Sequence, residues 1–229
     1  MKFKILSFCA VLFASGSVMA QSVHIKAGLN LANISISDNG SVDDAKKLTS
    51  FQVGLVGDIP LGSEMISFQP GILYTGKGSK TQSGSSTSST YSIQTFNPKY
   101  VEIPANFVFK VPFSKYGRVF AGAGPYLGIG VAGKNKIEGR IVGVEYSGEK
   151  SIKFSNDDPT TTSEDEGAGY NILRRYDYGL NGIAGIETSN TVFSVNYGYG
   201  LAKLQSGSNS ASNDINKHRV LSISVGFKF

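Results

Sequence analysis

The chain has almost none of the residues on which disulfide-linked and zinc-binding folds depend. Its 229 residues include one cysteine, two histidines and no tryptophan. A single cysteine excludes both a disulfide scaffold and a zinc site built on paired cysteines. The fold must therefore be held together by backbone hydrogen bonds and by the burial of apolar side chains.

Charged residues are also scarce, at 17% of the chain, whereas glycine is abundant, with 28 residues. This composition is unusual for a soluble helical enzyme, and 40% hydrophobic residues is too many for a disordered chain. The formal net charge is +5, and it falls to +3 if Lys2 and Lys4 are removed with a leader peptide. Such a weak positive charge gives no indication of a nucleic-acid partner.

The first twenty residues have the pattern of a secretory signal peptide. Lys2 and Lys4 supply a basic start, a short apolar stretch follows, and Val18-Met19-Ala20 provides the small residues of a cleavage site. The apolar stretch is too short to cross a bilayer as a helix. We expect a signal peptide at residues 1–20 and a mature domain at residues 21–229.

After Gln21 no apolar run reaches the roughly 18 residues that a membrane helix needs, which excludes a helical membrane protein. Apolar residues instead recur at every second position, as in Val23 to Leu31. This period places apolar and polar side chains on opposite faces of a β-strand. Eight segments follow the pattern and are expected to be strands: 23–35, 49–59, 65–75, 99–111, 118–131, 176–187, 191–201 and 218–229.

The connections between these segments alternate strictly between short and long. The short ones are 60–64, 112–117 and 188–190, and the long ones are 36–48, 76–98, 132–175 and 202–217. Outer-membrane barrels have short periplasmic turns and long outer loops, whereas a soluble β-sandwich gives no reason for this alternation. The sequence therefore predicts an all-β fold, a closed eight-stranded antiparallel up-and-down transmembrane barrel with four long outer loops and three short periplasmic turns.

Two further features favour the membrane barrel over the soluble sandwich. The second face of the strands is rich in glycine, which suits the crowded interior of a narrow barrel better than a solvated surface. Aromatic residues also collect near the strand ends, as they do in the interfacial girdles of membrane barrels. The expected outer girdle contains Tyr74, Tyr100, Tyr176, Tyr178 and Tyr199, and the expected periplasmic girdle contains Phe109, Phe113, Tyr116, Phe193, Phe227 and Phe229.

Several of these segments resemble strands of the PorT-like outer-membrane β-barrel family, which is common in Bacteroidota. The resemblance lies in AGLNLA at 27–32, FQPGILYTGKG at 68–78, YVEIP at 100–104, AGAGPY at 121–126 and YGL at 178–180. It extends over essentially the whole mature chain. It implies the barrel fold and a location in the outer membrane of a Gram-negative cell, but no single activity.

The polar face carries charged and amide residues at positions that point into such a barrel. A buried charge is stable only when it is paired and hydrogen-bonded, and eight strands leave room for little besides side chains. We expect these residues to form an internal network that fills the lumen, and the alternative is a narrow proton or solute path. The predicted lumen residues are Lys26, Asp58, Lys110, Arg118, Glu187 and Lys228 toward the periplasmic end, with Gln69, Glu102, Asn106, Asn181 and Asn196 above them.

The last predicted strand keeps apolar residues at every second position up to its final residue. This pattern resembles the signal that the β-barrel assembly machinery recognises during insertion. We expect this strand to pair with the first one, because an unpaired strand edge in lipid costs several kcal/mol per backbone group. The predicted assembly signal is Leu221, Ile223, Val225, Phe227 and Phe229, all facing outer-membrane lipid.

Three patterns suggest chemistry but do not hold up. Residues 128–134, GIGVAGK, match most of a P-loop, yet Asn135 stands where serine or threonine should hold magnesium. The acidic residues within 157–166 lack the spacing of a calcium loop. His218 could serve an outer-membrane hydrolase with Asp177, Asp214 or Ser222, but no spacing fixes a nucleophile beside a base. We therefore predict no enzyme activity and no catalytic, cofactor-binding or metal-binding residue.

Function is expected to lie in the outer loops. The segment 78–95 is rich in serine and threonine and is expected to stay mobile, because it cannot bury apolar surface. The loop 132–175 contains more apolar residues and is expected to extend the neighbouring strands or to form a hairpin. The expected role is binding of an extracellular ligand or an envelope protein, and a narrow channel and a secretion-system accessory barrel are the alternatives.

Overall fold

The computed structural model describes residues 22–35, 47–85, 87–155, 172–204 and 217–229. Over these residues the chain forms β-strands and no helix, and it therefore has no helix that could cross a membrane there. The strands are β1 (Ser22–Ser35), β2 (Leu48–Pro60), β3 (Ile66–Gly76), β4 (Ser79–Ser83), β5 (Tyr91–Pro112), β6 (Arg118–Ile141), β7 (Val144–Ser151), β8 (Lys153–Phe154), β9 (Ile172–Leu173), β10 (Tyr176–Glu187), β11 (Thr191–Gly200) and β12 (Lys217–Lys228).

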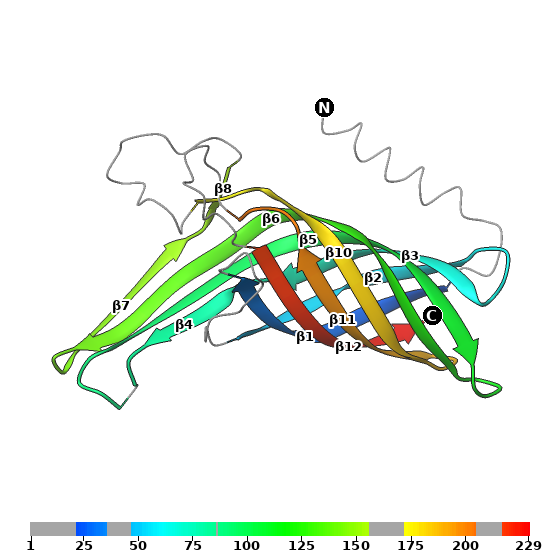
Figure 1. The fold of residues 1–229 in the computed structure, drawn as a ribbon, viewed down its shortest axis with the longest axis horizontal. Helices are drawn as coiled ribbons and strands as arrows, with labels where there is room; N and C mark the ends of the chain where they lie inside the picture. Colours follow the sequence, from blue (N-terminus) through cyan, green and yellow to red (C-terminus); the bar gives the residue numbers. More distant parts are fainter. Residues whose placement is uncertain (1–21, 36–46, 86, 156–171, 205–216) are drawn as a thin grey trace.

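Eight of these strands close into an antiparallel ring (Figure 1). Each strand pairs with the next in the order β1, β2, β3, β5, β6, β10, β11, β12. β12 then returns to β1, from His24 opposite Lys228 to Ser35 opposite Lys217. The prediction of an all-β antiparallel fold is confirmed, and each of the eight predicted segments overlaps one strand of the ring.

The two faces of the ring strands differ in chemistry as the alternation requires. Leu29, Phe107 and Ile223 point outward and are exposed, whereas Asn30 and Asn106 point inward and are buried. The exterior is thus apolar and the interior polar, the reverse of a water-soluble β-sandwich. Such a surface is stable where the surrounding medium is hydrocarbon.

The two ends of the ring are built differently. At one end, here the turn end, the short connections 61–65, 113–117 and 188–190 join neighbouring strands. The chain also finishes at this end, where the backbone N–H of Phe229 donates to the Val23 carbonyl at 3.2 Å. At the other end, here the loop end, the long connections leave the ring.

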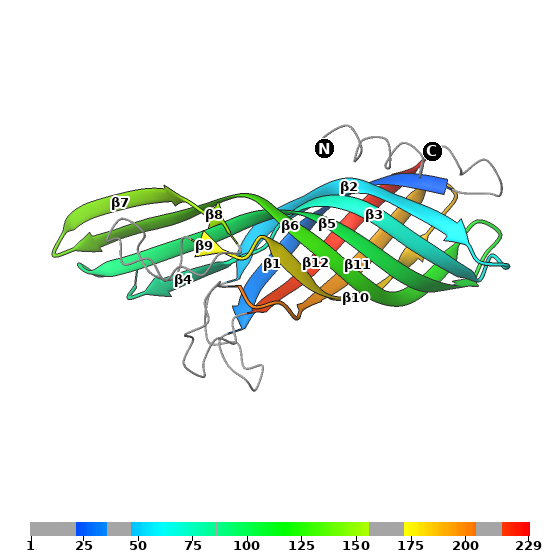
Figure 2. The ribbon, with the colours of Figure 1, turned by 90° about the horizontal axis from the view of Figure 1, so that it is seen from above.

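β5 and β6 continue far past the loop end, with 22 and 24 residues, whereas the other ring strands have 10 to 14. Their extensions pair from Tyr91 opposite Arg140 onward, β4 adds to β5, and β7 adds to β6. We call this four-stranded layer, formed by β4, residues 91–99, residues 132–141 and β7, the outer sheet. It projects along the ring axis in both views (Figures 1 and 2).

The outer sheet corrects one expectation and decides another. The serine- and threonine-rich segment 78–95, expected to be mobile, instead contains β4 and the start of β5. Strand pairing satisfies its backbone polar groups, so the segment does not need an apolar core to become ordered. For the loop 132–175 both expected arrangements occur, because β6 extends to Ile141 and then forms a hairpin with β7.

A second correction concerns Tyr100, which was expected in the outer aromatic girdle. Its side chain is buried inside the ring, 2% exposed. Side chains along a strand alternate between its two faces. Tyr100 lies two residues before the inward-facing Glu102, so both side chains point into the ring. The pairing of β5 with β6 shifts register between Lys99 and Tyr100, and this irregularity marks the junction between the ring and the outer sheet.

β5 and β6 approach each other closely where β6 carries glycine. A Cβ atom at Gly124 would lie 2.0 Å from the Ala105 carbonyl oxygen, and one at Gly122 would lie 2.3 Å from that of Phe107. No side chain fits at those distances. The glycine-rich face therefore permits the tight ring that the interior groups described next require.

Candidate functional site

The interior of the ring holds a cluster of charged side chains at the turn end. Lys110 lies at its centre, with Nζ 2.5 Å from Asp58 Oδ2 and 3.1 Å from Glu187 Oε2. Glu187 also receives Arg118 Nε at 3.2 Å and Lys228 Nζ at 3.1 Å. We call these residues, with Gln69, the turn-end cluster.

The turn-end cluster draws its members from strands that lie far apart in the ring. Asp58 is on β2, Lys110 on β5 and Glu187 on β10, so the ion pairs cross the interior. Gln69 Nε2 also donates to this carboxylate, at 3.2 Å from Asp58 Oδ1. Six of the predicted lumen residues therefore meet here, although Arg118 is partly exposed at the rim and also reaches Glu64 at 3.3 Å.

A second cluster lies toward the loop end. Lys77 Nζ lies 2.5 Å from Glu102 Oε2 and 2.8 Å from Asp177 Oδ2. Tyr126 donates its hydroxyl to Asp177 Oδ2 at 3.2 Å, and Lys77 Nζ sits 4.0 Å from the centre of the Tyr126 ring. We call these four residues the loop-end cluster.

Sequence reasoning placed Glu102 in the lumen but missed its partner Lys77. The sequence does contain a signal for Lys77. This lysine lies at the next inward-facing position after Gln69 and Thr75, just past the predicted end of the strand. Asp177 was considered only as a partner for His218. Both residues are buried, so the pair is part of the interior and not of a loop surface.

Above the loop-end cluster the ring is covered by apolar side chains. They form a buried cluster with Phe154 packed against it, and the Phe154 ring meets the Tyr100 ring edge-on with centres 5.7 Å apart. We call this group the apolar cap. Its buried members are Ile34, Phe96, Ile152, Leu173 and Leu204.

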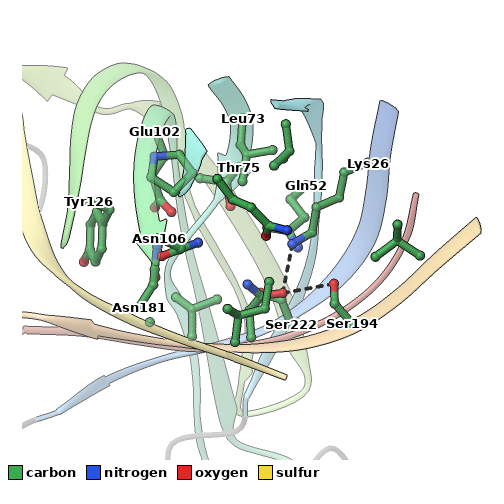
Figure 3. Close-up of a pocket in the computed structure, with 18 of the residues that line it drawn as sticks. Lys26, Gln52, Leu73, Thr75, Glu102, Asn106, Tyr126, Asn181, Ser194 and Ser222 are labelled. Atoms are coloured by element: carbon green, nitrogen blue, oxygen red, sulfur yellow. Dashed lines mark hydrogen bonds between the residues drawn. The ribbon is translucent and has the colours of Figure 1, made fainter. Parts of the chain in front are cut away.

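Between the two clusters lies a central cavity lined mainly by polar side chains (Figure 3). The space open to the centre of a water molecule is about 40 Å³, which is room for only a few waters. Lys26 Nζ donates to Asn196 Oδ1 at 2.9 Å inside this cavity. Lys26 was expected with the turn-end charges, but its hydrogen bond is to a neutral amide in the middle of the ring.

The remaining predicted lumen residues, Asn106 and Asn181, also line the central cavity (Figure 3). Both are buried. Asn106 Oδ1 has no hydrogen-bond partner within the described residues. All eleven predicted lumen residues thus face the interior or its rim, in two ionic groups separated by a polar cavity.

His218, the residue considered for a hydrolase, is buried inside the loop end, 2% exposed. Its Nε2 lies 3.3 Å from the Tyr100 hydroxyl, and Nδ1 has no partner among the described residues. Ser222 lines the central cavity instead. Asp214 lies outside the described residues. Within the described part of the chain no serine, threonine or cysteine is hydrogen-bonded to this imidazole, so the geometry assembles no nucleophile and base.

The two remaining sequence patterns are the P-loop-like stretch and the acidic run. Residues 128–134 run along the extended strand β6, and Lys134 at their end pairs with Glu149 at 2.7 Å. A phosphate loop needs a turn and a following helix, which β6 does not provide. The acidic run within 157–166 lies outside the described residues. Elsewhere in the described ranges no group of three potential metal ligands occurs.

The predicted assembly residues lie on the outer face of β12. Leu221, Ile223, Phe227 and Phe229 are exposed large apolar side chains there, and Val225 lies between them, half-buried. β12 pairs on both sides, with β1 and with β11. These side chains therefore form an outward row on the strand that closes the ring.

The outer sheet offers an exposed surface with a defined backbone. Every residue of β7 is exposed. At the hairpin tip Val142 is 82% exposed and Val144 71%. Val142 also has a left-handed backbone, φ 49°, which is unfavourable for a β-branched residue. The apolar tip is thus kept despite a conformation that asparagine or glycine would adopt more easily.

Solved structures of small outer-membrane proteins are similar to this chain at low sequence identity. Ail, the attachment invasion locus protein of Yersinia pestis, has a TM-score of 0.40 at 15% identity, with 92% of this chain and 100% of that chain covered. Neisserial surface protein A has a TM-score of 0.45 at 14% identity, with 91% and 95% covered. OprG from Pseudomonas aeruginosa has a TM-score of 0.39 at 12% identity, with 92% and 96% covered.

No curated protein matches the sequence significantly. The family model for the outer membrane protein beta-barrel domain, however, matches residues 19–206. This span covers most of the chain and reaches from just before β1 to beyond β11. The closed ring, its apolar exterior and this match agree, and the chain belongs to the outer membrane protein beta-barrel domain family.

Proposed function

We propose that this outer-membrane barrel acts by binding a protein partner outside the cell through its outer sheet. The proposal takes residues 1–20 as a cleaved signal peptide, the turn end as periplasmic and the loop end as external. Short turns on the periplasmic side and long connections outside are the rule for outer-membrane barrels. Membership of the narrower PorT-like family of Bacteroidota stays a prediction.

The observation that carries the proposal is the length of β5 and β6. β6 has 24 residues, which at about 3.3 Å per residue is roughly 80 Å, whereas a tilted strand crosses the membrane in about 9 to 11 residues. A barrel that needed only to span the membrane would not require such extensions. The outer sheet therefore holds a defined surface well away from the lipid.

The charges of the outer sheet indicate the kind of partner. Six of its nine charged side chains form three ion pairs, and the other three, Lys80, Lys99 and Lys150, give the sheet a net charge of only +3. This charge is too small to indicate a nucleic acid or other polyanion. The exposed groups also include apolar and aromatic side chains, such as Val144 and Tyr146, and the cores of protein interfaces are apolar and enriched in aromatic residues. The pairs are Lys134 with Glu149 at 2.7 Å, Lys136 with Glu138 at 2.7 Å and Arg140 with Glu145 at 2.5 Å.

Site-specific photocross-linking in intact cells tests this function. A photoreactive residue is placed at Val144 or Tyr146, both exposed on β7. The matched control positions are Lys115, exposed in the turn 113–117 at the turn end, and Phe107, exposed on the outer face of the ring. We expect discrete protein adducts from the β7 positions only. Absence of adducts there, or the same adducts from Lys115, would reject the outer sheet as the binding surface.

A narrow channel is the second candidate, favoured by the polar central cavity. Against it stand the two ionic clusters and the apolar cap, which leave about 40 Å³ of free space. We expect planar bilayers containing the protein to show no stable conductance step. A reproducible step that disappears when Lys26 or Glu102 is replaced would favour transport instead.

A further inference from the structure

Lys26 is the charged interior residue without a charged partner. Its side chain is buried, 5% exposed, and among the described residues no carboxylate oxygen lies within 4.0 Å of its Nζ. An ammonium group has three N–H donors, and only one of them is used, in the bond to Asn196 Oδ1 at 2.9 Å. The other two have no protein acceptor among the described residues.

No neighbouring carboxylate in the described ranges makes a direct ion pair with Lys26, because each is in contact with another cation. Glu102 is the carboxylate whose charge acts on Lys26 across the cavity, but it is held by Lys77 at 2.5 Å. Asp58 and Glu187 are held by Lys110 in the turn-end cluster. Five cations reach the described interior, and Lys26 is the one that has no carboxylate within 4.0 Å among the described residues.

A second donor with no acceptor faces the same space. Gln52 Nε2 is buried without a hydrogen-bond partner in the described residues, and Gln52 and Lys26 both line the central cavity (Figure 3). Asn196 Oδ1 accepts from Lys26, and Ser194 Oγ also donates to it at 3.4 Å. The Asn196 side chain therefore turns its oxygen, and not its NH₂ group, toward the ammonium. The free donors that face the cavity are those of Lys26 and Gln52. His24 Nδ1 and the acceptor Asn106 Oδ1, also without partners among the described residues, line the same cavity.

A buried charge is costly unless it is paired, and buried donors are rarely left without acceptors. The cavity has about 40 Å³ open to the centre of a water molecule, which also admits one ion of similar size. We propose that the central cavity binds one small monovalent anion, of the size of chloride, on the Lys26 ammonium and the Gln52 amide. Larger anions such as gluconate do not fit this volume.

Two measurements on the protein purified from outer membranes test the site. The first compares the midpoint of thermal unfolding in sodium chloride, sodium bromide and sodium gluconate at equal ionic strength. We expect a saturable rise of several degrees with either halide over gluconate, since a ligand bound only by the folded state stabilises it. The second is anomalous diffraction from crystals grown in bromide, where we expect a peak within the cavity beside Lys26 Nζ.

Matched variants assign the effect to the cavity. Lys26→Met keeps the length of the side chain and removes the charge, and it should abolish the halide effect. Lys99→Met is the control, because Lys99 donates to Ser50 at 2.9 Å and does not line the cavity; this variant should keep the whole effect.

The proposal is overturned if the parent protein unfolds at the same midpoint in halide and gluconate, or if bromide peaks lie only on the exterior. It is also overturned if Lys26→Met responds to halide as the parent does. Should Lys26→Met fail to fold, the diffraction measurement on the parent still decides.

Discussion

Removing the ammonium group of Lys110 should destabilise the ring more than any other single lysine substitution in the turn-end cluster. In Lys110→Met a side chain of similar length remains, but Asp58 loses its only ion-pair partner among the described residues. Breaking a buried ion pair by deleting one member costs about 3 to 5 kcal/mol. Glu187 keeps Arg118 and Lys228, each within 3.2 Å. We therefore expect the free energy of unfolding to fall by the low end of this range, about 3 kcal/mol.

A double-mutant cycle separates this mechanism from a general loss of packing. Asp58→Asn removes the charge that Lys110→Met leaves unpaired, so the double variant should be more stable than Lys110→Met alone by about 1 to 3 kcal/mol. Stability is measured by urea unfolding in lipid vesicles, followed by the shift of the folded band in unheated gels. Lys115→Met, in the exposed turn 113–117, serves as the control and should change little. If the double variant is as unstable as the sum of the single changes, the ion pair is not what the substitution disturbs.

Three further outcomes follow from the strands themselves. Phe229→Asp should cost the folded barrel only about 0 to 1 kcal/mol, because the residue sits at the membrane edge, yet it should sharply lower the amount of inserted protein in fractionated membranes. Phe113→Asp, another exposed aromatic change at the turn end, should insert normally, and equal insertion of both variants would show that the terminal row is no assembly signal. Gly124→Val should prevent folding of the ring, because its Cβ would lie 2.0 Å from the Ala105 carbonyl oxygen; a native band shift on gels would contradict the close approach of β5 and β6. Val142→Asn should stabilise the β6–β7 hairpin by about 1 kcal/mol, since asparagine tolerates the left-handed backbone, and slower amide hydrogen exchange of residues 137–148 would report it, whereas faster exchange would refute it.

The ring could be predicted from the sequence because lipid outside and a polar interior impose period-two alternation on every strand that crosses the membrane. The same physics explains why the outer sheet was not predicted at its full extent. Both faces of β7 are exposed, so no alternation distinguishes one side from the other. The stretches 91–97 and 133–140 are ordered by pairing with each other, and pairing leaves no such mark on the composition.

The interior could be predicted by position but not by partner. Parity places Lys110, Asp58 and Glu187 inside, but these residues lie on strands that are not neighbours in the ring. Which of them meet depends on ring diameter and strand tilt, which a sequence pattern does not specify. Lys77 was missed for a simpler reason: the predicted strand ends at residue 75, two positions before it.

The apolar cap sets a boundary for what can change on the outside of this protein. Its members come from β1, β5, β8, β9 and two connections, and of these only Phe96 also belongs to the outer sheet. A hairpin can therefore be shortened, exchanged or replaced by a foreign peptide without wetting the interior, provided that Phe96, Ile152 and Phe154 stay in place. The barrel is in this sense a display scaffold, whose outermost segment can be exchanged while the cap beneath it stays in place.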